Sequence, residues 1–213
     1  MKRGSRTKAF QPTPQNGTAE GWRSVVPKIE SSMDYKQLLW ESHHYRFGLA
    51  GEGQADAIEQ LLRTHRGRVL NVGCGLDGRK IARLASHCQS HVALDHGLGM
   101  LTAARSTCNA DNVSFIAADA HSLPFPSDSV DHVIALGLFA YINDPVHVLR
   151  EFRRVCRPHG YVMITNSVSR PEGEHRAAGV EAGLTVVDEA EGYCPAASGD
   201  IKRRYLLVFC EIL

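Results

Sequence analysis

The chain has 213 residues, of which 43% are hydrophobic and 22% charged, and its formal net charge at pH 7 is +1. This length fits one domain with an appendage or two small domains, and the apolar share allows a sizeable core. The near-neutral charge argues against nucleic acid as a partner. No apolar run approaches the roughly 18 residues of a membrane span, so we expect none.

The six cysteines are scattered and form no Cys-x-x-Cys pair, which favours a reducing, cytoplasmic setting. The basic N-terminus is followed by no apolar segment, so we expect no secretory signal. The eleven histidines are dispersed, and only His43 and His44 are adjacent. Because neighbouring residues rarely point at one metal ion, we expect no metal site.

Residues 1–21 are polar and contain several prolines and glycines, which predicts a disordered tail. Residues 22–66 then predict a helical cap. Its first helix begins at Asp34 and is rich in aromatic residues, and its second carries Ile58 and Leu62 on one face. Two interpretations stay open: both helices simply pack on a sheet, or the first one covers a pocket.

Residues 67–213 predict a separate domain that opens with a strand, a glycine turn and a helix. Residues 69–72 are a short apolar run, glycines follow at positions 73, 75 and 78, and residues 80–85 have helical spacing. This order is typical of a nucleotide-binding βαβ unit, although it also occurs as a plain connection. Glycine suits such a turn because it tolerates positive φ and lets a ligand approach the backbone.

Residues 91–95 predict a second strand that ends in an acid, Asp95, 20 residues beyond Gly75. That spacing suits a carboxylate that accepts hydrogen bonds from a ribose diol, and the alternative is an exposed loop residue. The segment 119–126 contains Pro124 and Pro126, which exclude a helix or central strand. It therefore predicts a loop at the carboxyl end of strand 113–117, where open α/β sheets bind ligands.

The remaining segments predict strands near 130–136, 161–165, 184–187 and 204–213, and helices that begin near Pro145 and Glu174. A loop at 192–199 joins the last two strands, so the final strand can insert antiparallel. The predicted fold is α/β: a doubly wound, seven-stranded, mostly parallel sheet with an antiparallel last strand and an N-terminal helical cap.

Five segments occur along the chain at regular places in the predicted fold: Val69-Leu70-Asn71-Val72-Gly73-Cys74-Gly75, Ala93-Leu94-Asp95, Ala118-Asp119-Ala120-x-x-Leu123-Pro124-Phe125, Ser129-Val130-Asp131 and Val155-x-Arg157-Pro158-x-Gly160. In this order and spacing, the sequence resembles the class I S-adenosylmethionine-dependent methyltransferases. The resemblance is strongest to the small-molecule, ubiquinone/menaquinone-type (type 11) branch and covers about two thirds of the chain. The resemblance implies a Rossmann-like fold.

The resemblance also implies roles for single residues. Asp95 would hold the ribose hydroxyls, and Asp119 with the N–H of Ala120 would read the adenine edge. The residues implied in cofactor binding are Asn71, Gly73, Cys74, Gly75, Asp95, His96, Asp119, Ala120, Leu136 and Gly137.

Three positions depart from the family pattern. Asn71 stands where relatives usually have an acid, and Asp77 stands where they usually have glycine. Many relatives also carry two histidines where this chain has Ala140 and Tyr141. These departures concern the methionine end of the cofactor.

The leading hypothesis is methyl transfer from S-adenosylmethionine to oxygen, nitrogen or carbon of a small-molecule acceptor by in-line displacement. Two alternatives are a non-catalytic protein that binds a cofactor or partner, and an NAD-dependent dehydrogenase, whose Gly-x-Gly-x-x-Gly fingerprint residues 73–78 match. The sequence does not indicate the oligomeric state. Catalytic residues are unassigned, and the acceptor-side candidates are His43, His44, Tyr45 and Tyr141.

Overall fold

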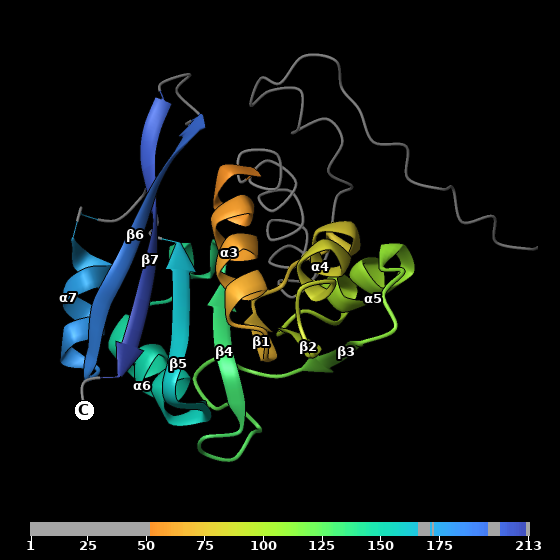
Figure 1. The fold of residues 1–213 in the computed structure, drawn as a ribbon, viewed down its shortest axis with the longest axis horizontal. Coiled ribbons are helices and arrows are strands. Elements are labelled where there is room, and N and C mark those ends of the chain that lie inside the picture. Colours follow the sequence, from red (N-terminus) through yellow and green to blue (C-terminus); the bar gives the residue numbers. More distant parts are fainter. Residues whose placement is uncertain (1–51, 166–170, 172, 196–200, 212–213) are drawn as a thin grey trace, which may run out of the picture.

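The structure, a computed structural model, describes residues 52–165, 171, 173–195 and 201–211. One mixed sheet runs through it in the strand order β3-β2-β1-β4-β5-β7-β6 (Figure 1). The strands are β1 (Arg68–Val72), β2 (Ser90–Asp95), β3 (Val113–Ala117), β4 (Val130–Ala135), β5 (Cys156–Thr165), β6 (Leu184–Pro195) and β7 (Ile201–Glu211).

Strands β1 to β5 are parallel to one another, and β7 runs antiparallel to both β5 and β6. The strand order reverses at β1, which pairs with β2 on one side and β4 on the other. In open α/β sheets, ligands bind outside the carboxyl ends of the strands at such a switch point. The predicted Rossmann-like α/β fold with a mostly parallel sheet is confirmed.

Helices cover both faces of the sheet. One core cluster joins β1 and β4 to α6, and a second joins the opposite face of β1 to α3 and α4. Within the described residues no helix is long and apolar enough to cross a membrane. The helices are α3 (Glu52–Thr64), α4 (Gly78–Ala85), α5 (Leu98–Thr107), the short 3-10 helix η1 (Leu138–Ala140), α6 (Pro145–Val155) and α7 (Glu174–Glu181).

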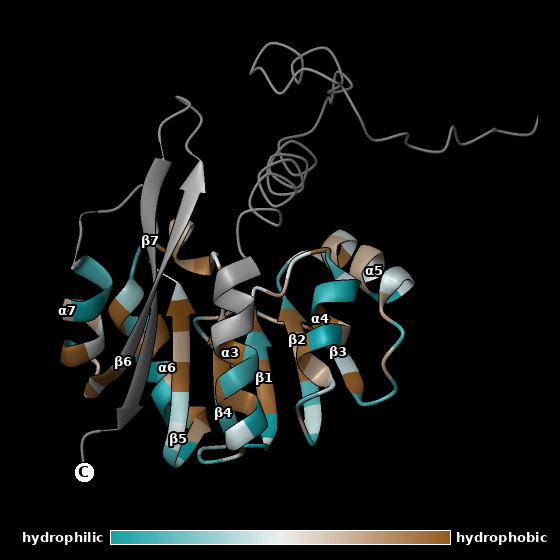
Figure 2. Cartoon of the chain, turned by 45° about the horizontal axis from the view of Figure 1, so that its top comes forward, coloured by the Kyte–Doolittle hydropathy of each residue, from teal (hydrophilic) through white to brown (hydrophobic). Residues whose placement is uncertain are grey.

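The central strands are buried on both faces, as the near-continuous apolar runs predict. Side chains alternate along β1: Leu70 and Val72 belong to the cluster on the α6 side, whereas Val69 belongs to the α3 side. All six residues of β4 are buried. Figure 2, coloured by hydropathy, shows hydrophobic colour on much of the neighbouring strand β5 and hydrophilic colour on α4.

Strand β6 is longer than predicted. We expected a strand at 184–187 and a loop at 192–199, but β6 continues to Pro195 and pairs with β7 along this length. Strand β5 pairs with β7 only from Thr165↔Leu206 to Val162↔Phe209, so the outer part of the β6–β7 ribbon extends past the end of β5 (Figure 1). A two-stranded ribbon that extends beyond the core can form without a run of apolar residues. Hydrophobicity alone therefore could not predict the full length of β6.

Strand β5 also begins earlier than predicted. The strand predicted at 161–165 starts at Cys156, and its first part contains an irregularity where the pairing with β4 shifts between Val130 and His132. His159 has a φ of 64° there, in the left-handed region. A bulge of this kind re-aims a strand without ending it.

Helix α3 matches the second helix predicted for the N-terminal cap. Its Ile58 and Leu62 have no exposed surface and lie in the cluster with Val69, Ile134 and Met163. This helix therefore packs on the sheet, which both interpretations allow, because they differ only in the first cap helix. The predicted tail and first cap helix, with His43, His44 and Tyr45, lie outside the described residues.

A buried histidine near the start of β2 should make the fold sensitive to acid. His91 is 1% exposed, its Nε2 has no hydrogen-bond partner among the described residues, and burial lowers its pKa to about 4 from 6.5. Between these values only the unfolded chain binds the proton, so stability falls as the pH drops through this range. When the pH falls from 7 to about 4.5, we expect His91 to lower the free energy of unfolding by about 2 kcal/mol.

Urea unfolding at the two pH values, for the wild type and His91→Leu, measures this contribution. The leucine variant keeps the apolar volume but cannot bind a proton, so its loss of stability should be smaller by that amount. Equal losses in both proteins would contradict the assignment.

Candidate cofactor site

The turn after β1 requires glycine at two positions. Gly73 and Gly75 have φ values of 67° and 68°, in the left-handed region that other residues rarely adopt. A Cβ at Gly73 would also lie 2.9 Å from Cδ1 of Leu138, so the turn closely approaches η1. The turn after β1 is thus in close contact with η1, which follows the carboxyl end of β4.

Asp95 links the first two loops of the site. Its Oδ2 accepts the N–H of Gly75 at 2.9 Å, and its Oδ1 accepts the N–H of Gly97 at the same distance. The residue is 3% exposed, so the alternative of an exposed loop aspartate is wrong. Each carboxylate oxygen has a second lone pair, which leaves Asp95 able to accept ligand hydroxyls.

The loop after β3 lies beside this carboxylate. The N–H of Ala118 donates to the Asp95 carbonyl at 3.2 Å. Asp119 is exposed, and its Oδ1 accepts the main-chain N–H of His121 at 2.9 Å and the ring Nδ1 at 2.8 Å. These two bonds, with smaller charge effects from His121 and His96, lower the pKa of the Asp119 carboxyl. Asp119 is therefore an anion at neutral pH with Oδ2 available.

The loop after β4 forms the other side of the site. Gly137 has a φ of 79°, and its N–H donates to Oγ1 of the buried Thr165 at 2.7 Å. Nothing lies within 4 Å of the position that a Gly137 Cβ would occupy. A ligand can therefore approach bare backbone here. Tyr141 is half-buried and follows η1, with its N–H donating to the Leu138 carbonyl.

Asn71 is buried at the carboxyl end of β1. It is 5% exposed. Its amide oxygen can accept a hydrogen bond, so a ligand group such as an ammonium at this strand end can donate to it.

The departure at Asp77 has a structural explanation. Asp77 is the N-cap of α4, where its Oδ1 accepts the N–H of Lys80 at 3.2 Å. A Cβ on the following Gly78 would lie 1.9 Å from the Ala104 carbonyl, so this glycine lets α4 pack tightly on α5. The third glycine of the motif therefore serves helix packing, and it does not itself shape the ligand turn.

The structure brings most of the predicted residues to one edge of the sheet. Cys74 donates its N–H to the Leu94 carbonyl at 3.0 Å, and burial raises the pKa of its thiol above the usual range. His96 is exposed, and Ala120 is 8% exposed. Leu136 is half-buried and packs against the core cluster on the α3 side.

Known proteins match the segment of this chain that forms the sheet and the candidate site. A family model described as a methyltransferase domain (type 11) matches residues 70–164. The phosphatidylethanolamine N-methyltransferase of Cereibacter sphaeroides is 30% identical over 166 residues, which are 76% of this chain and 79% of the relative. The chain belongs to the class I S-adenosylmethionine-dependent methyltransferases. S-adenosylmethionine is accordingly the cofactor of this methyltransferase.

Two further matches agree with this assignment. The demethylmenaquinone methyltransferase of Renibacterium salmoninarum is 38% identical over 98 residues, 46% of this chain and 40% of the relative. A methyltransferase solved in complex with the Trm112 activator of Haloferax volcanii shares the fold, with a TM-score of 0.67 and 21% identity. The alignment covers 85% of this chain and 96% of that one. The solved structure shows the shared fold, and the family model with the phosphatidylethanolamine N-methyltransferase relative favours a methyltransferase over the NAD-dependent dehydrogenase alternative.

The observed geometry fits this cofactor. The turn has positive φ values at Gly73 and Gly75, the Asp95 carboxylate has spare acceptor capacity, and the amide of Asn71 is buried at the end of β1. The residues that would hold the methionine, ribose and adenine parts therefore come from three adjacent strand ends.

Sequence analysis missed two residues that shape the site. Thr165 is fully buried at the end of β5 and fixes Gly137, and Gly97 donates to Asp95. A polar residue that ends an apolar strand was the available signal for Thr165, because it lies at the ligand edge of the sheet.

Within the described residues no group of three His, Cys, Asp or Glu side chains could hold a metal ion. We expect methyl transfer to survive treatment with EDTA, because the cofactor carries its own leaving group. The measurement is turnover before and after chelation and dialysis. Loss of activity that a divalent ion restores would contradict this prediction.

Proposed function

We propose that the chain transfers the methyl group of S-adenosylmethionine to a small-molecule acceptor at the carboxyl edge of β1, β2, β3 and β4. One observation carries the proposal: the loops after β1, β2 and β3 are joined by hydrogen bonds of Asp95, and the loop after β4 abuts the same turn. The family assignment supports the reaction type.

Each part of the cofactor has a proposed partner. Asp95 accepts the ribose hydroxyls, Asp119 with the Ala120 N–H reads the adenine edge, and Asn71 accepts the ammonium group. Gly73, Gly75 and Gly137 contact the cofactor through their backbone, with open space beside Gly137, while Cys74, His96 and Leu136 line the remaining wall. The cofactor supplies the methyl group and the leaving group, so the protein mainly aligns donor and acceptor. Alignment can lower a barrier by roughly 7–11 kcal/mol.

The acceptor atom is oxygen, nitrogen or carbon, and a general base is needed only if the acceptor must first lose a proton. Tyr141 is the described candidate on the acceptor side, and His43, His44 and Tyr45 are candidates from the sequence alone. Phosphatidylethanolamine and demethylmenaquinone, which the names of two relatives specify, are lipids. Lipid-like acceptors are therefore the first class to assay.

We further propose that residues 22–51 cover the site. A cofactor at the open edge of a sheet shares its site with water, and exclusion of water improves alignment. These residues contain Tyr35, Trp40 and Tyr45, and aromatic rings over a pocket attract a sulfonium. Because α3 packs on the sheet, we propose that the cofactor domain, predicted to begin at residue 67, includes this helix and begins at about residue 52. Residues 1–21 remain a proposed tail. Free thiols at Cys74, Cys88 and Cys108 support a reducing compartment such as the cytoplasm.

A non-catalytic binding protein is the second candidate. The observation that favours it is Asn71, because a neutral amide holds an ammonium less strongly than a carboxylate does. Turnover separates the two candidates. The protein is incubated with methyl-labelled S-adenosylmethionine and a panel of small-molecule and lipid acceptors, and labelled product is counted.

Labelled product with at least one acceptor is the expected result. Binding of S-adenosylhomocysteine without labelled product from any acceptor would favour the non-catalytic candidate. Calorimetric heat with NAD and none with S-adenosylhomocysteine would overturn the proposal altogether.

A further inference from the structure

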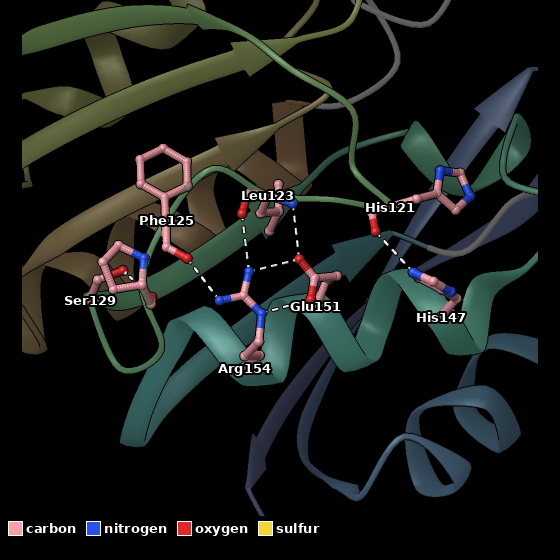
Figure 3. A network of polar contacts seen from close by, with 8 residues as sticks. His121, Leu123, Phe125, Ser129, His147, Glu151 and Arg154 are labelled. Atoms are coloured by element: carbon pink, nitrogen blue, oxygen red, sulfur yellow. Dashed lines mark hydrogen bonds and ion pairs between the residues drawn. The ribbon is translucent and has the colours of Figure 1, made fainter.

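The loop that carries Asp119 is fastened to helix α6 by side chains of the helix. His147, Glu151 and Arg154 follow one another at intervals of four and three residues, so they lie along one stripe of α6. Figure 3 shows all three directed at the loop between β3 and β4. The loop is therefore supported from outside the cofactor site.

Glu151 and Arg154 form the central part of this support. Arg154 donates from Nε to Oε1 of Glu151 at 2.7 Å and from Nη2 to Oε2 at 2.8 Å, a bidentate pair. The same pair bonds three main-chain groups of the loop. Oε2 of Glu151 accepts the Leu123 N–H at 2.9 Å, and Arg154 donates to the carbonyls of Phe125 at 2.8 Å and Leu123 at 3.1 Å.

Further contacts fix the loop on either side of this pair. The ring Nε2 of His147 bonds the carbonyl of His121 at 2.9 Å, and His121 itself holds Asp119. On the far side, the N–H of Asp128 donates to the Arg154 carbonyl at 3.0 Å. A continuous series of contacts thus joins α6 to the carboxylate that we assign to adenine.

The helix is a rigid base for these contacts. Val148, Leu149 and Phe152 on its other side have no exposed surface and belong to the main core cluster. The mutual hydrogen bonds lower the pKa of Glu151 and raise that of Arg154, so both groups stay charged across the neutral range. A charged, bidentate pair on a packed helix has little freedom to move.

We propose that Glu151 and Arg154 are positioning residues for cofactor recognition, which hold Asp119 and Ala120 in the geometry that selects adenine. Neither residue needs to touch the cofactor. The inference rests on the proposed function, because it takes Asp119 and the Ala120 N–H as the adenine contacts. It explains why three main-chain groups of one surface loop are bonded by a single ion pair.

Selection between two purines tests this role. S-inosylhomocysteine carries an oxo group where S-adenosylhomocysteine carries the amino group, so it would place an acceptor against the Asp119 carboxylate. The wild type should bind S-adenosylhomocysteine at least about tenfold more tightly, because a site built to bond a donor rejects an analogue that lacks it. Calorimetry with both ligands gives the ratio of dissociation constants.

The variants are Arg154→Lys, which keeps the charge but loses the planar fork, and Glu151→Gln, which keeps the shape but loses the charge. Arg150→Gln is the matched control, because Arg150 is exposed on the same helix and pairs with Glu181 at the surface. We expect the ratio to fall to about threefold or less in both variants and to stay at the wild-type value in the control. A partly unfolded sample leaves the ratio unchanged, so a purely structural role would not alter it.

Wild-type ratios in both variants would overturn the inference, and either variant suffices if the other does not fold. A wild type that binds both ligands equally would overturn it together with the adenine role of Asp119, while the methyl-transfer proposal would stand. A wild type that binds neither ligand would overturn the proposed function itself.

Discussion

Asp95→Ala should weaken the binding of S-adenosylhomocysteine at least about a hundredfold. A hydrogen bond to a charged group is worth about 1.5–3 kcal/mol, and we assign two ribose bonds to this carboxylate. The variant also leaves the N–H groups of Gly75 and Gly97 without their acceptor. Each buried group left unpaired costs about 1–3 kcal/mol, so the melting temperature should fall as well.

Calorimetric titration of the folded variant measures the first effect, and thermal unfolding without ligand measures the second. Asp111→Ala is the control, because Asp111 is an exposed residue in the turn before β3. A dissociation constant that is unchanged in a folded Asp95→Ala protein would remove Asp95 from the site.

Removal of residues 1–51 should abolish turnover, whereas removal of residues 1–20 should leave it nearly unchanged. The longer deletion keeps every described helix and strand, because the first of them, α3, begins at Glu52. It removes the aromatic segment that we propose covers the site. Without that cover the acceptor and the cofactor would share an open edge with water.

Methyl transfer by the two truncated proteins is the measurement, and circular dichroism shows whether each is folded. Binding of S-adenosylhomocysteine by the longer truncation separates loss of cover from loss of the cofactor site. A folded 52–213 protein with full activity would contradict the lid proposal and leave residues 22–51 without a role in catalysis.

The sequence predicted the parallel part of the fold well, because buried strands and amphipathic helices leave clear periodic signals. The strand at 113–117 has the predicted bounds, and α6 begins at Pro145 as the proline indicated. The outer β6–β7 ribbon was not predictable in this way. Beyond the end of β5, β6 and β7 pair only with each other and lie outside the core. The length of this ribbon is therefore not indicated by a run of apolar residues.

Residues of the candidate site could be predicted only where the residue type and its spacing from a motif indicate the role. Gly73 and Asp95 belong to this group, since a positive φ and a carboxylate at the end of a strand are needed at these positions. Thr165 and Arg154 do not, because their roles depend on loops that are distant in the sequence. The sequence also did not indicate the role of Asp77, which departs from the ligand-binding motif because it is the N-cap of α4.

A crystal structure with S-adenosylhomocysteine would show which atoms of the protein contact each part of the cofactor. We expect both ribose hydroxyls within about 2.5–3.2 Å of the Asp95 carboxylate. We also expect the adenine amino group at Asp119 and the methionine end near Asn71 and Gly137. A nucleoside bound away from the loops after β1, β2 and β3 would contradict this expectation.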